Sequence, residues 1–163
     1  MKLKDFVVTS AIIAELKSTD RDGAIAELIQ SLADSGQVPR SKVDDLISAV
    51  LARERVATTG MGKGVAMPHA KHASVKKVTA TIGRSREGID FNALDQGPVY
   101  SVVLLLSPPD SPEQHLQAME TIFRHLQRDN FRRFMRQAND KQEILELVAE
   151  ADAMPRSRGC RRS

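Results

Sequence analysis

The longest uninterrupted apolar run in this chain, Val102 to Leu106, constrains its fold more than any other feature. The run lies within a segment, residues 99–106, whose apolar residues follow one another instead of alternating. This pattern is typical of a strand buried on both faces, and such a strand needs helices above and below it. Helical periodicity occurs in the sequence both before and after the segment. We therefore predict an α/β fold, a three-layer α/β/α sandwich with a small mixed sheet.

Hydrophobic periodicity predicts the other elements of this fold. Alternation predicts strands at 12–16 and 78–82, and residues 57–74 are expected to form a structured loop in which residues 65–67 are a short strand. Spacings of three to four residues predict two early helices, one ended by Gly36 and one capped by Ser41. A third helix is expected to begin at Ser111, with Pro112 in its first turn and a buried stripe formed by residues 116, 119, 122, 123 and 126. Two shorter helices are expected around 131–137 and 141–149.

The composition is that of one globular domain, because 163 residues with 41% apolar content suffice for a single core. The longest apolar run is far shorter than the ~20 residues of a membrane span, and the N-terminus lacks the apolar stretch of a signal peptide. The single cysteine, Cys160, has no partner for an internal disulfide, which fits a reducing compartment. We therefore expect a cytoplasmic protein without membrane insertion.

The positive charge of the chain is concentrated near its C-terminus. The formal net charge is +3, but residues 155–163 hold four arginines and no acid, which leaves the preceding residues at −1. We therefore expect a domain over residues 1–152 and a basic, disordered tail over 153–163. A nucleic-acid-binding face is not expected.

Three glycines at alternate positions, Gly60, Gly62 and Gly64, superficially suggest a phosphate-binding loop. A dinucleotide fingerprint needs a helix that begins at the last glycine, but Pro68 follows four residues later. A P-loop needs Gly-Lys-Ser/Thr, whereas Lys63 is followed by glycine. The glycines more simply allow tight backbone conformations that present His69.

His69 is the candidate nucleophile. It follows Pro68, whose fixed φ restricts the direction of the imidazole. A histidine that accepts a phosphoryl group needs one ring nitrogen unprotonated and exposed, while the other is usually held by a hydrogen bond. Taken alone, however, His69 would more simply be an ordinary surface or loop histidine, so its neighbours decide the interpretation.

Two further residues strengthen the phosphoryl hypothesis. His115 is expected in the first turn of the helix that follows the buried strand, where it could be a neutral donor to a phosphate or could simply fill space. Arg53, at the end of the second helix, could offset charge during transfer or only stabilise the helix C-terminus. Thr59 and Gly64 are the candidate phosphate-binding residues.

The segment Thr59–Ala70, with the sequence TGMGKGVAMPHA, resembles the active-site signature of the type-2 enzyme IIA domains (fructose/mannitol class) of the bacterial phosphoenolpyruvate-dependent sugar phosphotransferase system (PTS). Residues 51–55, residues 88–91 and the helix start around His115 are also similar to the matching family segments. The resemblance covers residues 5–150.

This resemblance implies a phosphoryl carrier that uses a phosphohistidine and no cofactor. His69 would accept a phosphoryl group from the phosphocarrier HPr or its nitrogen-branch counterpart, with His115 as second active-site histidine and Arg53 as active-site arginine. The chain is most similar to the nitrogen-regulatory IIA proteins, which implies regulation of target proteins. The alternative is transfer to a separate IIB protein for sugar uptake. Lys63 departs from the histidine that nitrogen-regulatory members often carry, and it would add positive charge near the site.

Two other hypotheses remain open at this stage. Three histidines, His69, His72 and His115, could bind zinc, although no acidic or cysteine ligand lies near the loop and Lys63 and Lys71 oppose a cation. Alternatively, the chain could bind partners without ever being phosphorylated. Basic residues of the C-terminal half would then form a docking patch, or only a solvated helix face: Arg124, Arg128, Arg132, Arg133 and Arg136.

Overall fold

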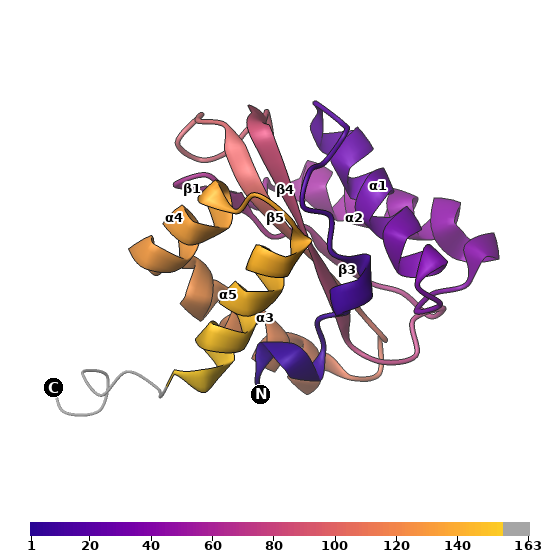
Figure 1. Cartoon of the computed structure of the whole chain (residues 1–163). Helices are drawn as coiled ribbons and strands as arrows, with labels where there is room; N and C mark the ends of the chain where they lie inside the picture. The colour runs from indigo at the N-terminus through magenta and orange to yellow at the C-terminus, as the bar shows by residue number, and fades with distance from the viewer. Residues whose placement is uncertain (155–163) are drawn as a thin grey trace, which may run out of the picture.

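A computed structural model describes residues 1–154, which form one mixed sheet between two helical layers (Figure 1). The strands are β1 (Gly60–Gly62), β2 (Val65–Ala66), β3 (His69–Lys71), β4 (Thr79–Ile89) and β5 (Val99–Ser107). The α-helices are α1 (Arg21–Asp34), α2 (Val43–Val56), α3 (Pro112–Leu126), α4 (Asp129–Gln137) and α5 (Lys141–Ala153). Short 3-10 turns occur at Leu3–Asp5, Thr9–Ala11 and Arg40–Lys42.

Strand β5 is the centre of the sheet. Strand β4 pairs with one of its edges in antiparallel register, whereas β2 and β3 lie one after the other along the opposite edge, both parallel to β5. Val65 is opposite Ser101, and His69 is opposite Leu105. Strand β1 pairs only with β2. The sheet is therefore small and mixed, as the sequence predicted.

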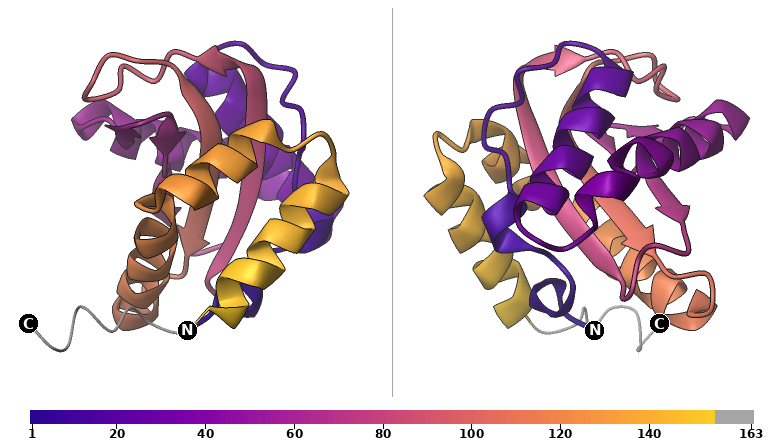
Figure 2. Two further views of the ribbon diagram at one scale, coloured as in Figure 1. Left: turned by 60° about the vertical axis from the view of Figure 1, so that its left-hand side comes forward. Right: turned by 90° about the vertical axis from the view of Figure 1, so that its right-hand side faces the viewer.

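Alternate residues of β5 face different helical layers. Val102, Leu104 and Leu106 belong to the core beneath α1 and α2, whereas Val103 and Leu105 belong to the core beneath α3, α4 and α5. Figures 1 and 2 show these two layers on opposite faces of the sheet. Because successive side chains of a strand point to opposite faces, a strand covered on both sides must be apolar throughout. The predicted three-layer sandwich is confirmed.

The helix ends agree with the sequence in part. Gly36 has φ +79° just beyond α1, as expected of a glycine that ends a helix. The predicted cap at Ser41 is wrong, because this residue lies in a 3-10 turn and α2 begins without a side-chain cap. Ser111 does hold the cap position of α3, with Pro112 next to it, but its side chain makes no capping hydrogen bond.

Two expectations about extended segments need correction. The predicted strand at 12–16 is only a bridge between Ile13 and Gly83 beside β4, since the 3-10 turn at Thr9–Ala11 interrupts the pairing. The predicted loop at 57–74 contains three short strands, so His69 begins a strand. Strand β4 also runs beyond the expected 78–82, as far as Ile89.

The C-terminal part of the fold extends slightly past the expected domain boundary, because α5 continues to Ala153. The predicted disordered tail lies, from residue 155 onward, outside the described residues. No helix within residues 1–154 has the length and apolarity needed to cross a bilayer.

Candidate functional site

Three elements bring the predicted site residues together at one end of the sheet. His69 begins β3, His115 lies in the first turn of α3, and Arg53 lies in the last turn of α2. The ring centroids of the two histidines are 5.7 Å apart, with an interplanar angle of 52°. The juxtaposition follows from the topology, because β3 runs parallel to β5 and α3 starts soon after β5 ends.

One hydrogen bond fixes the His69 ring. Its Nδ1 lies 2.9 Å from the carbonyl oxygen of Met67. A carbonyl oxygen only accepts, so Nδ1 must carry the proton and donate it. In the neutral ring the lone pair then belongs to Nε2, and the partly exposed side chain leaves it accessible to a reactant.

The surroundings of His69 favour its neutral form. Burial is the main cause that lowers the pKa of the imidazole, and the positive charges of Arg53 and Lys71 lower it further. The bond to Met67 and the charge of Glu54 act in the opposite direction without reversing the shift. A nucleophile needs an unprotonated nitrogen, so this shift keeps His69 reactive at neutral pH.

His115 is also neutral at neutral pH. Its side chain is buried, and its Nδ1 lies 2.6 Å from the hydroxyl oxygen of Ser107 at the end of β5. Burial first, and then the charges of His69 and Lys71, lower the pKa of His115 to about 4. If the Ser107 hydroxyl donates to Nδ1, the proton of the neutral ring belongs to Nε2, which can then donate to an anion.

Arg53 makes a structural hydrogen bond and also acts electrostatically on His69. Its Nη1 donates to the carbonyl oxygen of Ala57 at 2.9 Å, which stabilises the C-terminal end of α2. Its charge also lowers the pKa of His69, so the guanidinium acts electrostatically on the ring. Arg53 can therefore stabilise the end of α2 and influence the charge state of His69 at the same time.

The hydrogen bonds of Thr59 do not support its predicted contact with a phosphate. Its backbone N–H and its hydroxyl both donate to the carboxylate of Glu54, each at 2.7 Å. Neither donor is left for a phosphate in this arrangement. Glu54 had no role in the site predicted from the sequence, although its position continues the buried spacing of Val43, Leu46 and Val50. A charged residue at a buried helix position is the signal that could have identified it.

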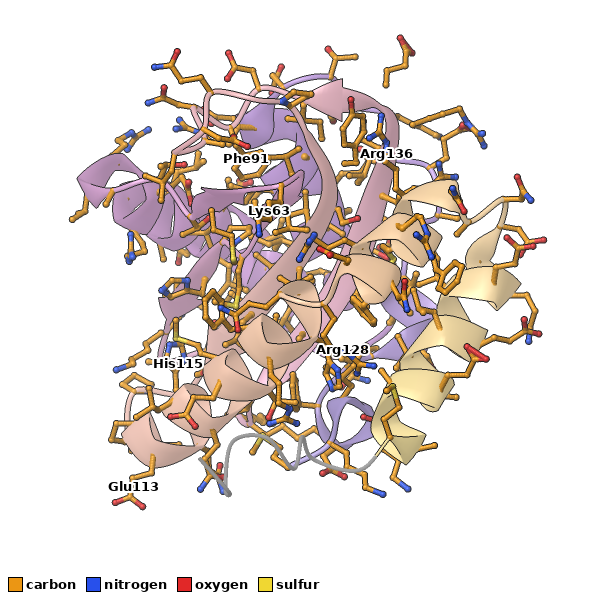
Figure 3. All side chains as sticks on the ribbon, turned by 90° about the vertical axis from the view of Figure 1, so that its left-hand side faces the viewer. Lys63, Phe91, Glu113, His115, Arg128 and Arg136 are labelled. Carbon is orange, nitrogen blue, oxygen red and sulfur yellow. The ribbon has the colours of Figure 1, made fainter. Side chains whose placement is uncertain are left out.

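Gly64 and Lys63 do not belong to the histidine site. The Gly64 carbonyl oxygen accepts from the backbone of Tyr100 and Ser101, at 2.8 and 3.1 Å. Ser101 precedes Leu105, the partner of His69, by four residues, or about 13 Å along a strand. The geometry therefore gives no support to the predicted phosphate contact of Gly64 or to the predicted charge of Lys63 near His69. Figure 3 shows Lys63 and His115 in different parts of the molecule.

The zinc hypothesis gains no support from the geometry. The backbone N–H of Ser74 donates to Nδ1 of His72 at 3.1 Å, and the Ser74 hydroxyl lies 2.8 Å from the same nitrogen. Within residues 1–154, no three side chains of His, Cys, Asp or Glu gather in a way that could hold a metal ion.

Helix α3 buries only part of the predicted stripe, because Ile122 and Leu126 are buried but Leu116 and Phe123 are not. Its buried residues include His115, Ala118 and Ile122, whereas Leu116 is 57% exposed and Phe123 is 42% exposed. Together with the partly exposed Met119, these two residues form an apolar row at helical spacing, which we call the α3 stripe. The stripe begins one residue after His115. Exposed apolar surface of this kind is typical of a protein docking site.

Comparison with known proteins identifies a matching family for nearly the whole domain. Residues 6–151 match the family model "Phosphoenolpyruvate-dependent sugar phosphotransferase system, EIIA 2". The chain is 38% identical over 130 residues to the fructose-specific EIIA component of the PTS of Haloferax volcanii, which covers 80% of this chain and 83% of that protein. It is 33% identical over 150 residues to a nitrogen regulatory protein of Bradyrhizobium diazoefficiens, which covers 91% and 95%.

Solved structures share the fold. The nitrogen regulatory protein IIA-Ntr of Neisseria meningitidis superimposes with a TM-score of 0.79 at 25% identity, over 90% of this chain and 98% of that chain. The IIA mannitol protein of Escherichia coli, solved in complex with phosphorylated IIB, gives a TM-score of 0.72 at 20% identity, over 86% and 95%.

The pKa shifts predict how the site responds to acid. NMR titration should give a pKa of about 4 for His115 and a pKa below the ordinary value for His69. Between pH 6.5 and pH 4, His115 binds a proton in the unfolded chain but stays neutral in the folded protein. The free energy of unfolding therefore decreases as the pH falls from about 6.5 towards 4. Urea unfolding of a His115→Gln variant at pH 7 and pH 5 should show a smaller loss than the parent protein. Titration of the His115 ring near pH 6.5 would contradict the arrangement.

Proposed function

The chain belongs to the EIIA 2 family of the phosphoenolpyruvate-dependent sugar phosphotransferase system, and we propose that it carries a phosphoryl group on Nε2 of His69. Domains of this family are phosphotransferase components, which fits a phosphoryl-carrier role. The observation that supports His69 as the acceptor is the hydrogen bond from its Nδ1 to the carbonyl of Met67, since this bond leaves Nε2 with the lone pair.

The transfer step uses only the lone pair of this nitrogen. Nε2 attacks the phosphorus of a phosphorylated donor protein, a P–N bond forms, and the bond between phosphorus and the donor breaks. The electron pair of the broken bond leaves with the donor. His69 already carries its proton on Nδ1, so no proton has to leave the ring before attack. The resulting phosphohistidine can pass its phosphoryl group to an acceptor in the same way.

His115 and Arg53 have complementary roles in this proposal. A neutral His115 donates from Nε2 to a phosphoryl oxygen without first losing or gaining a proton. Arg53 supplies a permanent positive charge that offsets the charge of the transferring group. Burial keeps both histidines uncharged, so their rings do not repel each other while the site is empty.

The α3 stripe is the proposed docking surface for the phosphoryl donor. A protein that delivers a phosphoryl group to His69 must cover the end of the sheet where α3 starts, and Leu116, Met119 and Phe123 offer apolar contact there. The donor is the phosphocarrier HPr or its nitrogen-branch counterpart. IIA domains of the PTS also pair with IIB proteins, as the mannitol complex from Escherichia coli illustrates.

Two downstream roles are supported by different relatives. We favour a nitrogen-type regulatory role, in which the phosphorylation state controls binding to target proteins, because the match spans 95% of the nitrogen regulatory protein of Bradyrhizobium diazoefficiens. The 38% identity to a fructose-specific EIIA component favours the second candidate, transfer to a separate IIB protein. A regulator that is never phosphorylated is the third candidate, and it predicts no phosphoryl transfer to His69.

Phosphorylation of variants tests the acceptor residue. Incubation with phosphorylated HPr, or with its phosphorylated nitrogen-branch counterpart, should label the protein with an acid-labile phosphate, and His69→Ala should abolish the label. His72→Ala is the matched control, because this nearby histidine engages only Ser74 among the hydrogen bonds of its ring, and it should be labelled normally. Equal labelling of the parent protein and His69→Ala would refute the proposal.

Transfer kinetics separate the residues proposed to act on the phosphoryl group from those of the docking surface. Arg53→Gln and His115→Gln should each lower kcat by roughly 100-fold, because each removes one donor or charge from the transferring group. Phe123→Ser should instead raise KM for the donor and leave kcat nearly unchanged. Rapid-quench measurement of phosphoryl transfer distinguishes the two patterns.

Matched controls exist for both kinds of variant. Arg55 is an exposed arginine in the same last turn of α2, and Phe134 is 50% exposed on α4. Arg55→Gln and Phe134→Ser should transfer at the rate of the parent protein. If either control lost as much activity as its partner variant, the assigned roles would be untenable.

The fate of the phosphoryl group decides between the two downstream roles. Phosphorylated protein mixed with IIB proteins of the fructose and mannitol class should keep its label if the role is regulatory. Rapid transfer of the label to one of these IIB proteins would instead establish the transport role. The experiment needs only gel separation of the two proteins after short incubation.

A further inference from the structure

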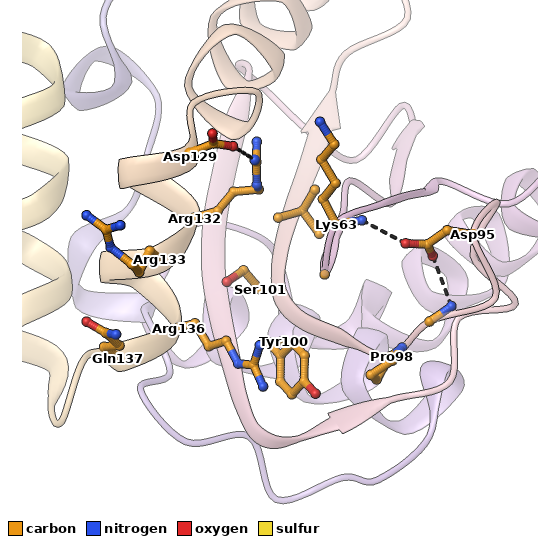
Figure 4. A pocket seen from close by; sticks show the side chains of 13 residues that line it. Lys63, Asp95, Pro98, Tyr100, Ser101, Asp129, Arg132, Arg133, Arg136 and Gln137 are labelled. Atoms are coloured by element: carbon orange, nitrogen blue, oxygen red, sulfur yellow. Dashed lines mark hydrogen bonds and ion pairs between the residues drawn. The ribbon is translucent and has the colours of Figure 1, made fainter.

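A pocket of about 660 Å³ lies near the N-terminal end of β5, whereas the histidine site lies near its C-terminal end. Helix α4 forms one wall, and the turn between β1 and β2, together with the segment before β5, forms the other. Tyr100 and Ser101 of β5 lie between these walls, as Figure 4 shows. Ser101 precedes Leu105 by four residues, about 13 Å along the strand, so the pocket is separate from His69.

Basic side chains from both walls line this pocket. Lys63 comes from the β1–β2 turn, whereas Arg132, Arg133 and Arg136 come from α4. The predicted basic docking patch is thus divided, since Arg128 contacts His125 and Met154 instead. These cations come from segments that are far apart in the sequence, yet they line one pocket. Such a convergence indicates an anionic ligand better than a row of charges along a single helix does.

The acidic residues of the pocket neutralise only one of these cations within the described residues. The Asp95 carboxylate accepts from the backbone N–H groups of Lys63 and Gly97, at 3.0 and 2.9 Å, and these bonds lower its pKa. Asp129 pairs with Arg132. Within residues 1–154, neither Lys63 nor Arg136 forms an ion pair with an acidic side chain. Two cations on facing walls therefore remain available to a ligand.

The Arg136 guanidinium is already oriented. Its carbon lies 3.7 Å from the centroid of the Tyr100 ring, within the range of a cation–π contact. Although Arg136 is exposed, this contact favours one orientation of its planar group, so less rotamer entropy is lost when it binds an anion. Figure 4 shows this side chain reaching from α4 towards Tyr100.

A buried arginine adds positive charge beneath the same wall. Arg84 lies on β4 opposite Ser101, is 2% exposed, and donates from Nε to the carbonyl of Ala14 and from Nη1 to the carbonyl of Arg136. Its Nη2 has no hydrogen-bond partner within the described residues. The charges of Glu15 and Glu143 act on Arg84, but neither forms an ion pair with it within the described residues. Burying a guanidinium is costly, and an anion bound near Arg136 would offset part of that cost through space.

We propose that this pocket binds a small organic phosphate. Its volume is within the range of roughly 300–1,000 Å³ that is usual for small-molecule sites. Guanidinium groups bind phosphate oxygens in a bidentate manner, and an ammonium group such as that of Lys63 adds a point charge. The ligand class is a phosphate ester or diphosphate with at least two negative charges, of the size of a mononucleotide or a hexose phosphate.

Calorimetric titration with three probes tests the proposal: inorganic pyrophosphate, AMP and a hexose monophosphate. At least one should bind at a single saturable site, more weakly at higher salt. Amide NMR shifts should change at Gly64, Ser101 and Gln137, not at His69. Arg136→Gln and Lys63→Gln should each weaken binding by about 10-fold or more, because each removes a charge-assisted contact.

Two further proteins serve as controls. Arg40→Gln removes the same charge from an exposed residue outside the pocket and should bind like the parent protein. His69→Ala should also bind normally, so that failure of the phosphoryl-carrier proposal and failure of this one can be told apart. Circular dichroism confirms that each variant is folded.

Four results would overturn the proposal. The first is that no probe binds at a saturable site, and the second is that Arg40→Gln weakens binding as much as Arg136→Gln does. The third is that the amide NMR shift changes centre on His69 and His115, and the fourth is that a long polyanion such as heparin binds but none of the three small phosphates does.

Discussion

The burial of β5 on both faces is the constraint on which the rest of the structure depends. Its alternate residues hold two separate cores together, one under α1 and α2 and one under the three C-terminal helices. The edge of β5 that faces away from β4 pairs with β3, so that His69 is opposite Leu105. The last residue of β5, Ser107, contacts His115. The strand that determines the layers therefore also determines where the two histidines meet.

The chemistry of the site follows from neutral imidazoles near a permanent cation. Lowering a pKa by one unit corresponds to about 1.4 kcal/mol between the two protonation states. Burial therefore strongly favours the uncharged form of His115, whose pKa is about 4. The carbonyl of Met67 then determines which nitrogen of His69 is free. In the proposed transfer, Arg53 supplies positive charge, and neither histidine has to change its protonation before a phosphoryl group arrives.

Residue patterns predicted the layers and the two histidines, but they failed where long-range pairing decides the structure. The strands β1, β2 and β3 have two or three residues each, and they form through pairing: β2 and β3 with β5, and β1 with β2. No local pattern could therefore show that His69 begins a strand. The same pairing carries Gly64 away from His69, although the two lie close in sequence.

The α3 stripe shows a different limit of prediction from sequence. Periodicity identifies an apolar row on a helix, but it does not show whether that row faces the core or the solvent. His115 and His125 occupy the buried face and count as polar in any hydropathy pattern, whereas Leu116 and Phe123 face outward. Thr59 illustrates a similar limit. Helical spacing suggests that Glu54 is buried, but only the structure shows that Glu54 accepts both hydrogen bonds from Thr59.

The position of the phosphoryl group on the imidazole most directly tests the proposed phosphoryl transfer. ¹⁵N–³¹P correlation NMR of the phosphorylated, ¹⁵N-labelled protein identifies the nitrogen that is bonded to phosphorus. The hydrogen bond at Met67 predicts a coupling to Nε2 of His69, with Nδ1 still protonated and bonded to the carbonyl of Met67. A coupling to Nδ1 of His69, or to a nitrogen of any other histidine, would contradict it.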